Sequence, residues 1–391
     1  MTEPHLPLSG VRVVEFSTMI TASLAAQMLA DQGAEVIKVE PPAGDPMRRI
    51  GSQVPGPDGA PGVSALFANC NKGKRSVVLD LKAGAELSVA RALCESADVV
   101  ISNYRPAVMA RLGLSFEALA DANPRLVFAR ITGFGTRGPQ AGRPAYDHVM
   151  QAQLSFAAIQ GGAETPRPMQ TAVCDKVTGI MAAQAVSSAL VGAARTGRGT
   201  RIDLSMMDSG LYFLFPDSFM DRTIRHDAAV HLPPLSDTYC VLEATDGHFV
   251  LAALGDAQWR AVFAMLGRPE LGEDPRFATM ASRMADYRGL LEEVTRAPVP
   301  HSVAGALDYL ARHDVPAAPC QDAAAVLEDP QLRACGTVQD VDDPHLGAIR
   351  AIRPAAIFGG MAAPADRPAP ALGEHTERVR ATGWNTSRKA V

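Results

Sequence analysis

Short β-rich segments alternate with helix-like segments along the first third of the chain, and this alternation constrains the fold more than any other feature. It predicts helices at residues 22–30 and 83–95, between strands at residues 11–16, 35–40, 75–80, 97–102 and 126–131. This order is the βαβ signature of a parallel sheet with helices on its faces. Ligands of such sheets bind at the carboxyl ends of the strands, so a site is expected in the loops after residues 16, 40, 102 and 131.

The pattern changes near residue 222. Residues 238–243 and 247–253 predict a β-hairpin, followed by helices at about 256–266 and 284–296. A stretch rich in Pro, Gly and Asp, residues 327–370, is typical of a segment that crosses a protein surface. We therefore expect an α/β fold with three parts: the first part of a large domain at residues 1–222, a smaller α+β domain at 223–322, and a C-terminal segment at 323–391 that returns to the large domain.

Composition and charge narrow the class of protein. The formal net charge of −5 gives no broad basic surface, so no nucleic-acid partner is expected. Residues 1–20 lack the pattern of a signal peptide, and the Ala-rich segment 180–194 is expected to be too polar and too small in side chain to span a bilayer. The six cysteines show no CxxC or Cys/His ligand spacing, and no HExxH occurs. We expect a cytoplasmic protein with reduced thiols, no metal and no membrane partner.

The segment from Gly133 to Gly138 matches the GxGxxG pattern of dinucleotide-binding proteins. That fingerprint must open a helix whose N-terminus holds the pyrophosphate. Here Pro139 and further loop residues follow, and no acidic residue ends a second strand about 20 residues later. The pattern therefore predicts no NAD site, and Gly133 and Gly135 are expected to let a loop pass close to another backbone or to a ligand.

Several basic and aromatic residues are candidates with two interpretations each. Lys72, Lys74 and Arg75 concentrate positive charge beside a predicted strand, which suits a phosphate group or an ordinary solvated edge. Arg48 carries the same ambiguity. Tyr104 follows a predicted strand, where its ring would stack on a base or pack in the core.

Asp175 precedes the Ala-rich segment and also has two interpretations. At the start of a helix its carboxylate would cap free N–H groups and be favoured by the helix dipole. The same environment keeps a partly buried carboxylate ionised and usable as a nucleophile. The neighbouring Cys174 lacks a visible His partner and is expected to act as a small apolar residue, and His148 stands without a placed partner.

A series of motifs runs along nearly the whole chain in a characteristic order. They are residues 8–17, 29–40, Gly44-Asp-Pro-Met-Arg48, Asn71-Lys-Gly-Lys-Arg75, Asn103-Tyr-Arg-Pro106, 111–114, 133–139, 144–147, 195–205 and 372–376. By these motifs the chain resembles the family III CoA-transferases, the family that also includes formyl-CoA transferase, carnitine CoA-transferase and the α-methylacyl-CoA racemases.

The resemblance implies a fold and a mechanism. It implies a Rossmann-like large domain, a small domain, and a homodimer of two interlaced chains. The family's nucleophilic aspartate matches Asp175, which would form an aspartyl anhydride and then an aspartyl-CoA thioester, with N–H groups at the helix start stabilising the oxyanions. Coenzyme A would be held, as acyl-CoA substrate, by Arg48, Lys72, Lys74, Arg75, Asn103, Tyr104, Arg111, Gly133 and Gly135, with Tyr146 and Asp147 lining the site.

Departures from the family pattern bear on the reaction. The racemases carry a His–Asp pair where this chain has Tyr146-Asp147, and epimerisation needs a base on each face of the α-carbon. Ile20 and Pro144 replace a glutamine and a lysine of the oxalate and formate members. The expected function is therefore CoA transfer from an acyl-CoA donor to a small carboxylic acid, such as a dicarboxylate. The alternatives are an α-methylacyl-CoA racemase and a catalytically idle CoA-binding relative.

Overall fold

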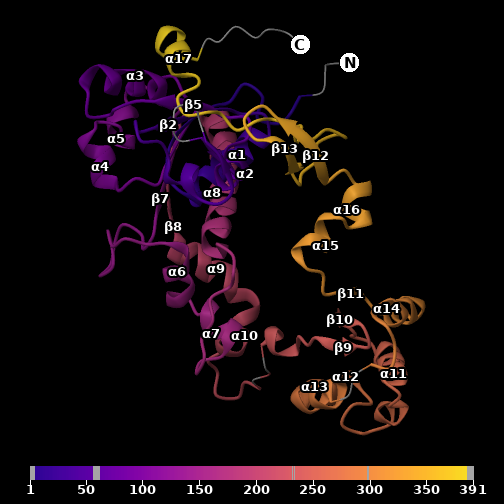
Figure 1. Ribbon diagram of the computed structural model, residues 1–391. Helices are drawn as coiled ribbons and strands as arrows, with labels where there is room; N and C mark the ends of the chain where they lie inside the picture. Colours follow the sequence, from indigo (N-terminus) through magenta and orange to yellow (C-terminus); the bar gives the residue numbers. More distant parts are fainter. Residues whose placement is uncertain (1–4, 56–61, 231, 233, 297–298, 385–391) are drawn as a thin grey trace. The chain divides into compact units, whose positions relative to one another are not determined.

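The chain forms two compact units, Met1–Phe213 with Pro330–Val391 and Leu214–Asp329 (Figure 1). This computed structural model describes residues 5–55, 62–230, 232, 234–296 and 299–384. The sequence prediction placed the corresponding boundaries at 222/223 and 322/323.

The first unit is built on a six-stranded parallel sheet in the order β5-β2-β1-β6-β7-β8. Its strands are β1 (Arg12–Phe16), β2 (Glu35–Glu40), β5 (Arg75–Val78), β6 (Val99–Ser102), β7 (Val127–Thr132) and β8 (Thr200–Ser205). The five predicted strands and the α/β class are confirmed, and every ladder pair is parallel. The edge strand β8 was not predicted as a strand.

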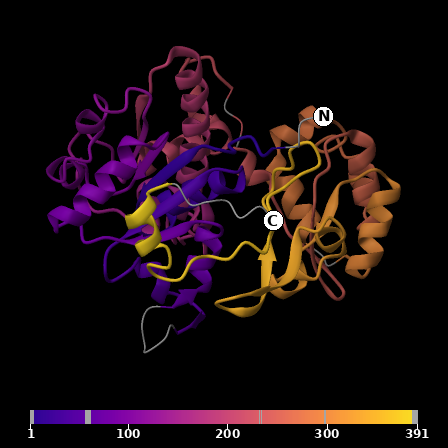
Figure 2. The same cartoon turned by 90° about the horizontal axis from the view of Figure 1, so that it is seen from above.

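Alternate residues of the strands face two separate helical layers. Val13 lies with α1 (Ile20–Asp31) and α8 (Val173–Thr196) in one core, whereas Val14 lies in the other. That second core includes α3 (Gly84–Glu95), α4 (Pro106–Arg111), α5 (Phe116–Leu119) and α17 (Thr376–Thr382), and α17 packs beside β5 (Figures 1 and 2). Because side chains alternate along a strand, strands covered on both faces become continuously apolar.

The sheet order reverses at β1. From β1 the chain moves to β2 and β5 on one side, and then returns to β6 on the other side. This reversal creates a topological switch point, where loops from β1 and β6 leave the carboxyl edge of the sheet side by side. The switch point is where a ligand crevice is expected in such a sheet.

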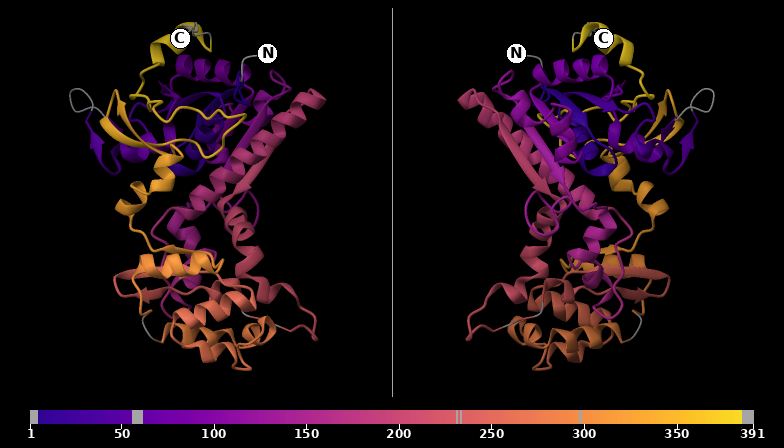
Figure 3. Two further views of the ribbon diagram at one scale, coloured as in Figure 1. Left: turned by 90° about the vertical axis from the view of Figure 1, so that its right-hand side faces the viewer. Right: turned by 90° about the vertical axis from the view of Figure 1, so that its left-hand side faces the viewer.

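Helix α8 runs along β7 and β8 and packs mainly against α1 (Figure 3). By length and hydropathy it is apolar enough to cross a membrane, so the expectation that this segment is too polar is wrong. A single such helix is weak evidence for a span, because core helices of globular domains pass the same test. Here its apolar side has protein partners, since Ala182, Ala183 and Val186 are buried against α1 and the sheet.

The remaining elements of the first unit flank the sheet. They are the 3₁₀ turn η1 (Pro46–Arg49), the short strands β3 (Gln53–Val54) and β4 (Val63–Ser64), α2 (Ala65–Asn71), α6 (Asp147–Gln153), α7 (Phe156–Gly161), α16 (Pro330–Ala334) and the antiparallel pair β12 (Val338–Asp343) and β13 (Gly347–Ile352). Helix α9 (Met206–Ser218) crosses the boundary between the units. The predicted return segment therefore contains its own hairpin.

The second unit packs helices on a three-stranded antiparallel sheet of order β11-β10-β9. Its strands are β9 (Leu242–Ala244), β10 (Gly247–Leu251) and β11 (Ala317–Pro319). Its helices are α10 (Met220–Thr223), η3 (Leu235–Thr238), α11 (Asp256–Met265), η4 (Pro269–Gly272), α12 (Met280–Ala285), α13 (Tyr287–Thr295), α14 (Val303–Arg312) and α15 (Ala323–Leu327). The predicted hairpin is confirmed between β9 and β10, although its first strand begins later than expected; β11 was not predicted.

Candidate active site

Asp175 lies in the first turn of α8, as predicted, but its side chain does not cap that helix. The N-cap position is Ala172, and no side-chain cap hydrogen bond is formed there. Instead, Oδ1 of Asp175 accepts a hydrogen bond from the hydroxyl of Thr21 on α1. The backbone N–H of Asp175 donates to Oδ1 of Asp147 at 3.0 Å. Of the two interpretations left open by the sequence, side-chain capping is therefore wrong.

The surroundings of Asp175 make its carboxylate more basic than an exposed one. Burial raises the pKa of Asp175 to about 6, and the charge of Asp147 acts in the same direction. The hydrogen bond from Thr21 opposes this rise, because it favours the ionised form. At neutral pH the group is mostly ionised and only partly hidden, which is the condition a carboxylate nucleophile requires.

Gln151 ties the start of α6 to the segment that leads into α8. Its Nε2 donates to Oδ2 of Asp147 at 2.6 Å and to the carbonyl of Thr171 at 2.9 Å, while its Oε1 accepts from the N–H of Met169 at 2.8 Å. This buried amide therefore holds Asp147, the acceptor of the Asp175 N–H, in place. Sequence reasoning missed Gln151; its spacing of four residues from Asp147 on one helix was the available signal.

The loop between β1 and α1 is clamped at the switch point. Asn103, just after β6, accepts from the N–H of Thr18 at 3.1 Å and donates to its carbonyl at 2.7 Å. Met19 then takes a φ of 63°, a left-handed conformation that is costly for a side-chain-bearing residue, and its N–H donates to Asp45 at 3.3 Å. Asn103 thus has a structural role here, and its predicted contact with CoA stays a prediction.

A fully buried cluster of charges lies beneath this loop. Glu15 pairs with Lys38 and with Lys74, each at 2.7 Å, and Lys38 also pairs with Asp45 at 2.9 Å. Burial alone would raise the pKa of Glu15, but the two lysines lower it to about 2. Lys74 is buried and neutralises Glu15, which gives it a structural role, and its predicted contact with CoA stays a prediction.

Arg48 is likewise an interior residue. Its guanidinium binds both carboxylate oxygens of Glu40, at 2.6 and 2.8 Å, stacks over the Phe67 ring at 3.6 Å, and donates to the carbonyl of Pro370 at 3.1 Å. The Arg48 hydrogen bonds and charge outweigh the effect of burial and lower the pKa of Glu40. These donors give Arg48 a structural role inside the domain, and its predicted contact with CoA stays a prediction.

The other three predicted basic contacts are more accessible. Lys72 is partly buried and donates to the carbonyl of Ile352 at 2.8 Å. Arg75 pairs with Glu35 at 3.2 Å near the surface, and Arg111 is exposed at the end of α4. Contacts of Lys72, Arg75 and Arg111 with CoA stay predictions.

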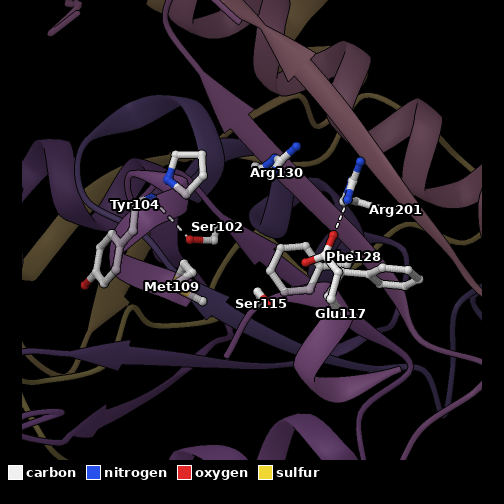
Figure 4. A pocket seen from close by; sticks show the side chains of 10 residues that line it. Ser102, Tyr104, Met109, Ser115, Glu117, Phe128, Arg130 and Arg201 are labelled. Atoms are coloured by element: carbon white, nitrogen blue, oxygen red, sulfur yellow. Dashed lines mark hydrogen bonds and ion pairs between the residues drawn. The ribbon is translucent and has the colours of Figure 1, made fainter. Parts of the chain in front are cut away.

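Tyr104 packs its ring against Phe16, with centroids 6.5 Å apart and an interplanar angle of 58°. Tyr104 also lines one wall of a small pocket (Figure 4). The pocket is lined by Ser102, Tyr104, Pro106, Met109, Ser115, Phe116, Glu117, Phe128, Arg130 and Arg201. Its volume of about 10 Å³ suits one water molecule and excludes a nucleotide base. Core packing therefore accounts for this side of Tyr104, and stacking on a base stays a prediction.

The loop after β7 contains Gly133 and Gly135. A Cβ at Gly133 would lie 2.2 Å from the Cβ of Ala145, so this glycine does allow two loop segments to touch, as predicted. Gly135 has a φ of 84°, and no helix begins before α6 at Asp147.

Gly135 borders a polar cleft of about 590 Å³ lined by Thr132, Phe134, Gly135, Thr136, Arg137, Arg201, Asp203, Leu204, Ser205 and Asp208. This volume is in the range of ligand sites.

The remaining candidates, Tyr146, His148 and Cys174, lie at the starts of α6 and α8. Tyr146 is 60% exposed at the start of α6 and stacks on His148, with ring centroids 6.4 Å apart. Burial, with the charges of Asp147 and Asp175, raises the pKa of the Cys174 thiol to about 12. Cys174 therefore stays a protonated, small apolar residue. Within the described part of the chain, no three His, Cys, Asp or Glu residues gather as a metal site.

Comparison with known proteins identifies a family whose pattern covers nearly the whole chain. The model of CoA-transferase family III matches residues 8–376. The chain is 34% identical to the succinate–glutarate CoA-transferase of Agrobacterium fabrum over 391 residues, covering 98% of both chains, and 34% identical to the acetyl-CoA:oxalate CoA-transferase of Acetobacter aceti over 338 residues, covering 85% of both. Among solved structures, Rv3272 from M. tuberculosis matches with a TM-score of 0.82 at 30% identity, covering 96% of this chain and 99% of that one.

Proposed function

This chain belongs to CoA-transferase family III and is a CoA-transferase, and we propose that it moves CoA from an acyl-CoA donor to a small dicarboxylic acid through Asp175. CoA thioesters are its substrates. The observation that carries the assignment of Asp175 is its setting: a carboxylate in the first turn of α8, with its pKa raised to about 6 and one oxygen held by Thr21.

The reaction begins with attack of Asp175 on the donor thioester. A carboxylate oxygen forms a bond to the acyl carbon, the C–S bond breaks, and CoA leaves as a thiolate. The thiolate then attacks Cγ of Asp175, the C–O bond of the mixed anhydride breaks, and the donor acid leaves as a carboxylate. The product is an aspartyl-CoA thioester, so the activation of the donor is kept and no ATP is needed.

The acceptor acid repeats these steps in reverse. Its carboxylate attacks the aspartyl thioester and displaces the thiolate, which then attacks the acceptor's acyl carbon and frees Asp175. Both relatives compared above have a dicarboxylic acid in their names, which supports a dicarboxylate as acceptor here. Arg137, exposed at the polar cleft after β7, offers a positive charge for a second carboxylate.

We also propose that the enzyme is an interlaced homodimer in the cytoplasm. Helix α8 is covered on one side only: Ile180 and Val191 remain 51% and 52% exposed, and Tyr212 on α9 is 76% exposed. Apolar side chains exposed on neighbouring helices favour a partner surface. Light scattering should give twice the mass of the chain, whereas a monomeric mass would contradict the dimer.

The first experiment tests Asp175 directly. The protein is incubated with succinyl-CoA, digested with pepsin at acid pH, and the peptide containing Asp175 is weighed and fragmented. We expect a CoA-sized or succinyl-sized adduct at Asp175, absent from Asp175→Ala and retained at reduced amount in Asp147→Asn.

The outcomes separate the proposed reactions. An adduct at Asp175 together with transfer of CoA to glutarate or another dicarboxylate supports the proposal. Full turnover by Asp175→Asn would refute Asp175 as nucleophile. The epimerase alternative has no support in the site, since position 146 is tyrosine and His148 has no hydrogen bond to Asp175 among the described residues. Deuterium uptake at the α-carbon of a 2-methylacyl-CoA would support the epimerase instead.

A further inference from the structure

Helices α1 and α8 approach closely because position 179 is glycine. A Cβ there would lie 2.9 Å from the carbonyl oxygen of Thr21 and 3.5 Å from the N–H nitrogen of Ala25. Gly179 and Asp175 are four residues apart, so they share one face of α8. The contact at Gly179 therefore brings the first turn of α1 over the carboxylate.

The hydroxyl of Thr21 is used in an unusual way for a threonine in a helix. Such a hydroxyl commonly bonds to a carbonyl of its own helix. Thr21 is buried, and within the described residues its hydroxyl bonds to Oδ1 of Asp175 alone, 154 positions away in the chain. The clamps on Thr18 and Met19 hold the start of α1, so the direction of this donor is fixed by the fold.

The two oxygens of Asp175 are therefore not equivalent. Oδ1 is held by Thr21, whereas Oδ2 accepts no hydrogen bond from the described residues and is not cut off from solvent. We propose that Thr21 is a positioning residue that holds Oδ1 of Asp175, leaves Oδ2 as the attacking atom, and donates to Oδ1 when this oxygen becomes an oxyanion. This inference rests on the proposed function.

The atom balance of the second step explains why this donor matters. After Oδ2 has bonded to the acyl carbon, Oδ1 is the carbonyl oxygen of the aspartyl half of the anhydride. Attack of the thiolate on Cγ places the negative charge on Oδ1, beside the Thr21 hydroxyl. Collapse breaks the Cγ–Oδ2 bond, the donor acid leaves with Oδ2, and Oδ1 remains as the thioester carbonyl. Thr21 keeps its proton throughout.

Another donor for this oxyanion is harder to find at the helix start. The N–H of Asp175 already donates to Asp147, and the N–H of Val173 donates to the carbonyl of Thr171 at 2.9 Å. The helix-start N–H groups expected from the resemblance are thus partly engaged. A preorganised donor aimed at a developing oxyanion is among the larger contributions to catalysis.

The test compares Thr21→Val, which removes the hydroxyl at nearly constant shape, with Thr21→Ser, which keeps it. Thr178→Val is the matched control: it removes a buried hydroxyl that donates to the carbonyl of Cys174 in its own helix at 2.7 Å and that makes no hydrogen bond to Asp175. For Thr21→Val we expect kcat to fall about 10- to 100-fold, the range of one hydrogen bond to a charged group. The acid limb of its pH profile should move to higher pH, because the ionised carboxylate loses a donor.

The intermediates provide a second readout. Slower attack on Cγ should raise the ratio of acyl adduct to CoA adduct at Asp175 in Thr21→Val. For Thr21→Ser and Thr178→Val we expect a kcat within about threefold of the wild-type value and an acid limb at the wild-type pH. If Thr21→Val does not fold, Thr21→Ala is measured in the same way.

Each outcome bears on one proposal. A folded Thr21→Val or Thr21→Ala enzyme with wild-type kcat, pH limb and adduct ratio would overturn the role of Thr21 while leaving Asp175 as nucleophile. Absence of any adduct at Asp175 in the wild-type enzyme would instead overturn the proposed function.

Discussion

Replacing Glu15 by Gln should destabilise the protein strongly, because one carboxylate neutralises two buried lysines. Glu15, Lys38 and Lys74 are all shielded from solvent, and the two ion pairs are 2.7 Å long. With Gln at this position, Lys38 keeps its ion pair with Asp45, whereas Lys74 loses its ion pair with Glu15. Removal of one partner from a buried pair leaves an uncompensated charge in a medium that solvates it poorly.

The magnitude follows from the pKa of Glu15. Its fall from 4.5 to about 2 means that the folded protein favours the ionised form by about 3 kcal/mol. Because the folded pKa is depressed, this stabilisation is present above pH 4.5 and is lost as the pH falls toward 2. In Glu15→Gln it is absent at every pH, and we expect a loss of about 3–5 kcal/mol, or roughly 5–10 °C in Tm.

Denaturant and thermal unfolding of the purified variant check this value. The control is Glu35→Gln, which removes a partly exposed partner of Arg75 and should cost less than about 1 kcal/mol. Lys74→Met should also lose stability while keeping the KM for acyl-CoA. A cost below about 1 kcal/mol for Glu15→Gln, or an unchanged Tm with a raised KM in Lys74→Met, would refute the structural role of the cluster.

Two further predictions concern the site and its support. The kcat/KM for transfer should fall as the pH drops through about 6, where Asp175 takes up a proton. Asp147→Asn should move this fall to lower pH, because it removes a negative charge beside Asp175. A kcat/KM that stays constant down to about pH 5 would contradict the role of Asp175. Arg48→Met should lower the free energy of unfolding by about 3–5 kcal/mol, because it removes the buried ion pair with Glu40. Arg49 is an exposed neighbour, and Arg49→Met should change the free energy of unfolding by less than about 0.5 kcal/mol. Equal effects of the two substitutions would argue against the buried pair.

Local patterns predicted the layered part of the fold well. The five strands from residue 12 to residue 132 are short apolar runs separated by helical periods, and such runs are typical of strands covered on both faces. β8 and β11 were missed because each is an edge strand with exposed residues. An edge strand lacks the continuous apolar run that marks a central one.

The sequence alone determined the parallel sheet and the place of Asp175 at the start of a long helix, because both follow from residue types at fixed short spacings. The tertiary structure decided which charges face inward. Lys74 and Arg48 carry the positive charge that a phosphate site needs, yet in the structure they form buried ion pairs with Glu15 and Glu40. The tertiary structure also brought Thr21 to Asp175, because that contact depends on how two helices distant in the sequence pack against each other. The spacing of residues within one helix does not determine how it crosses another.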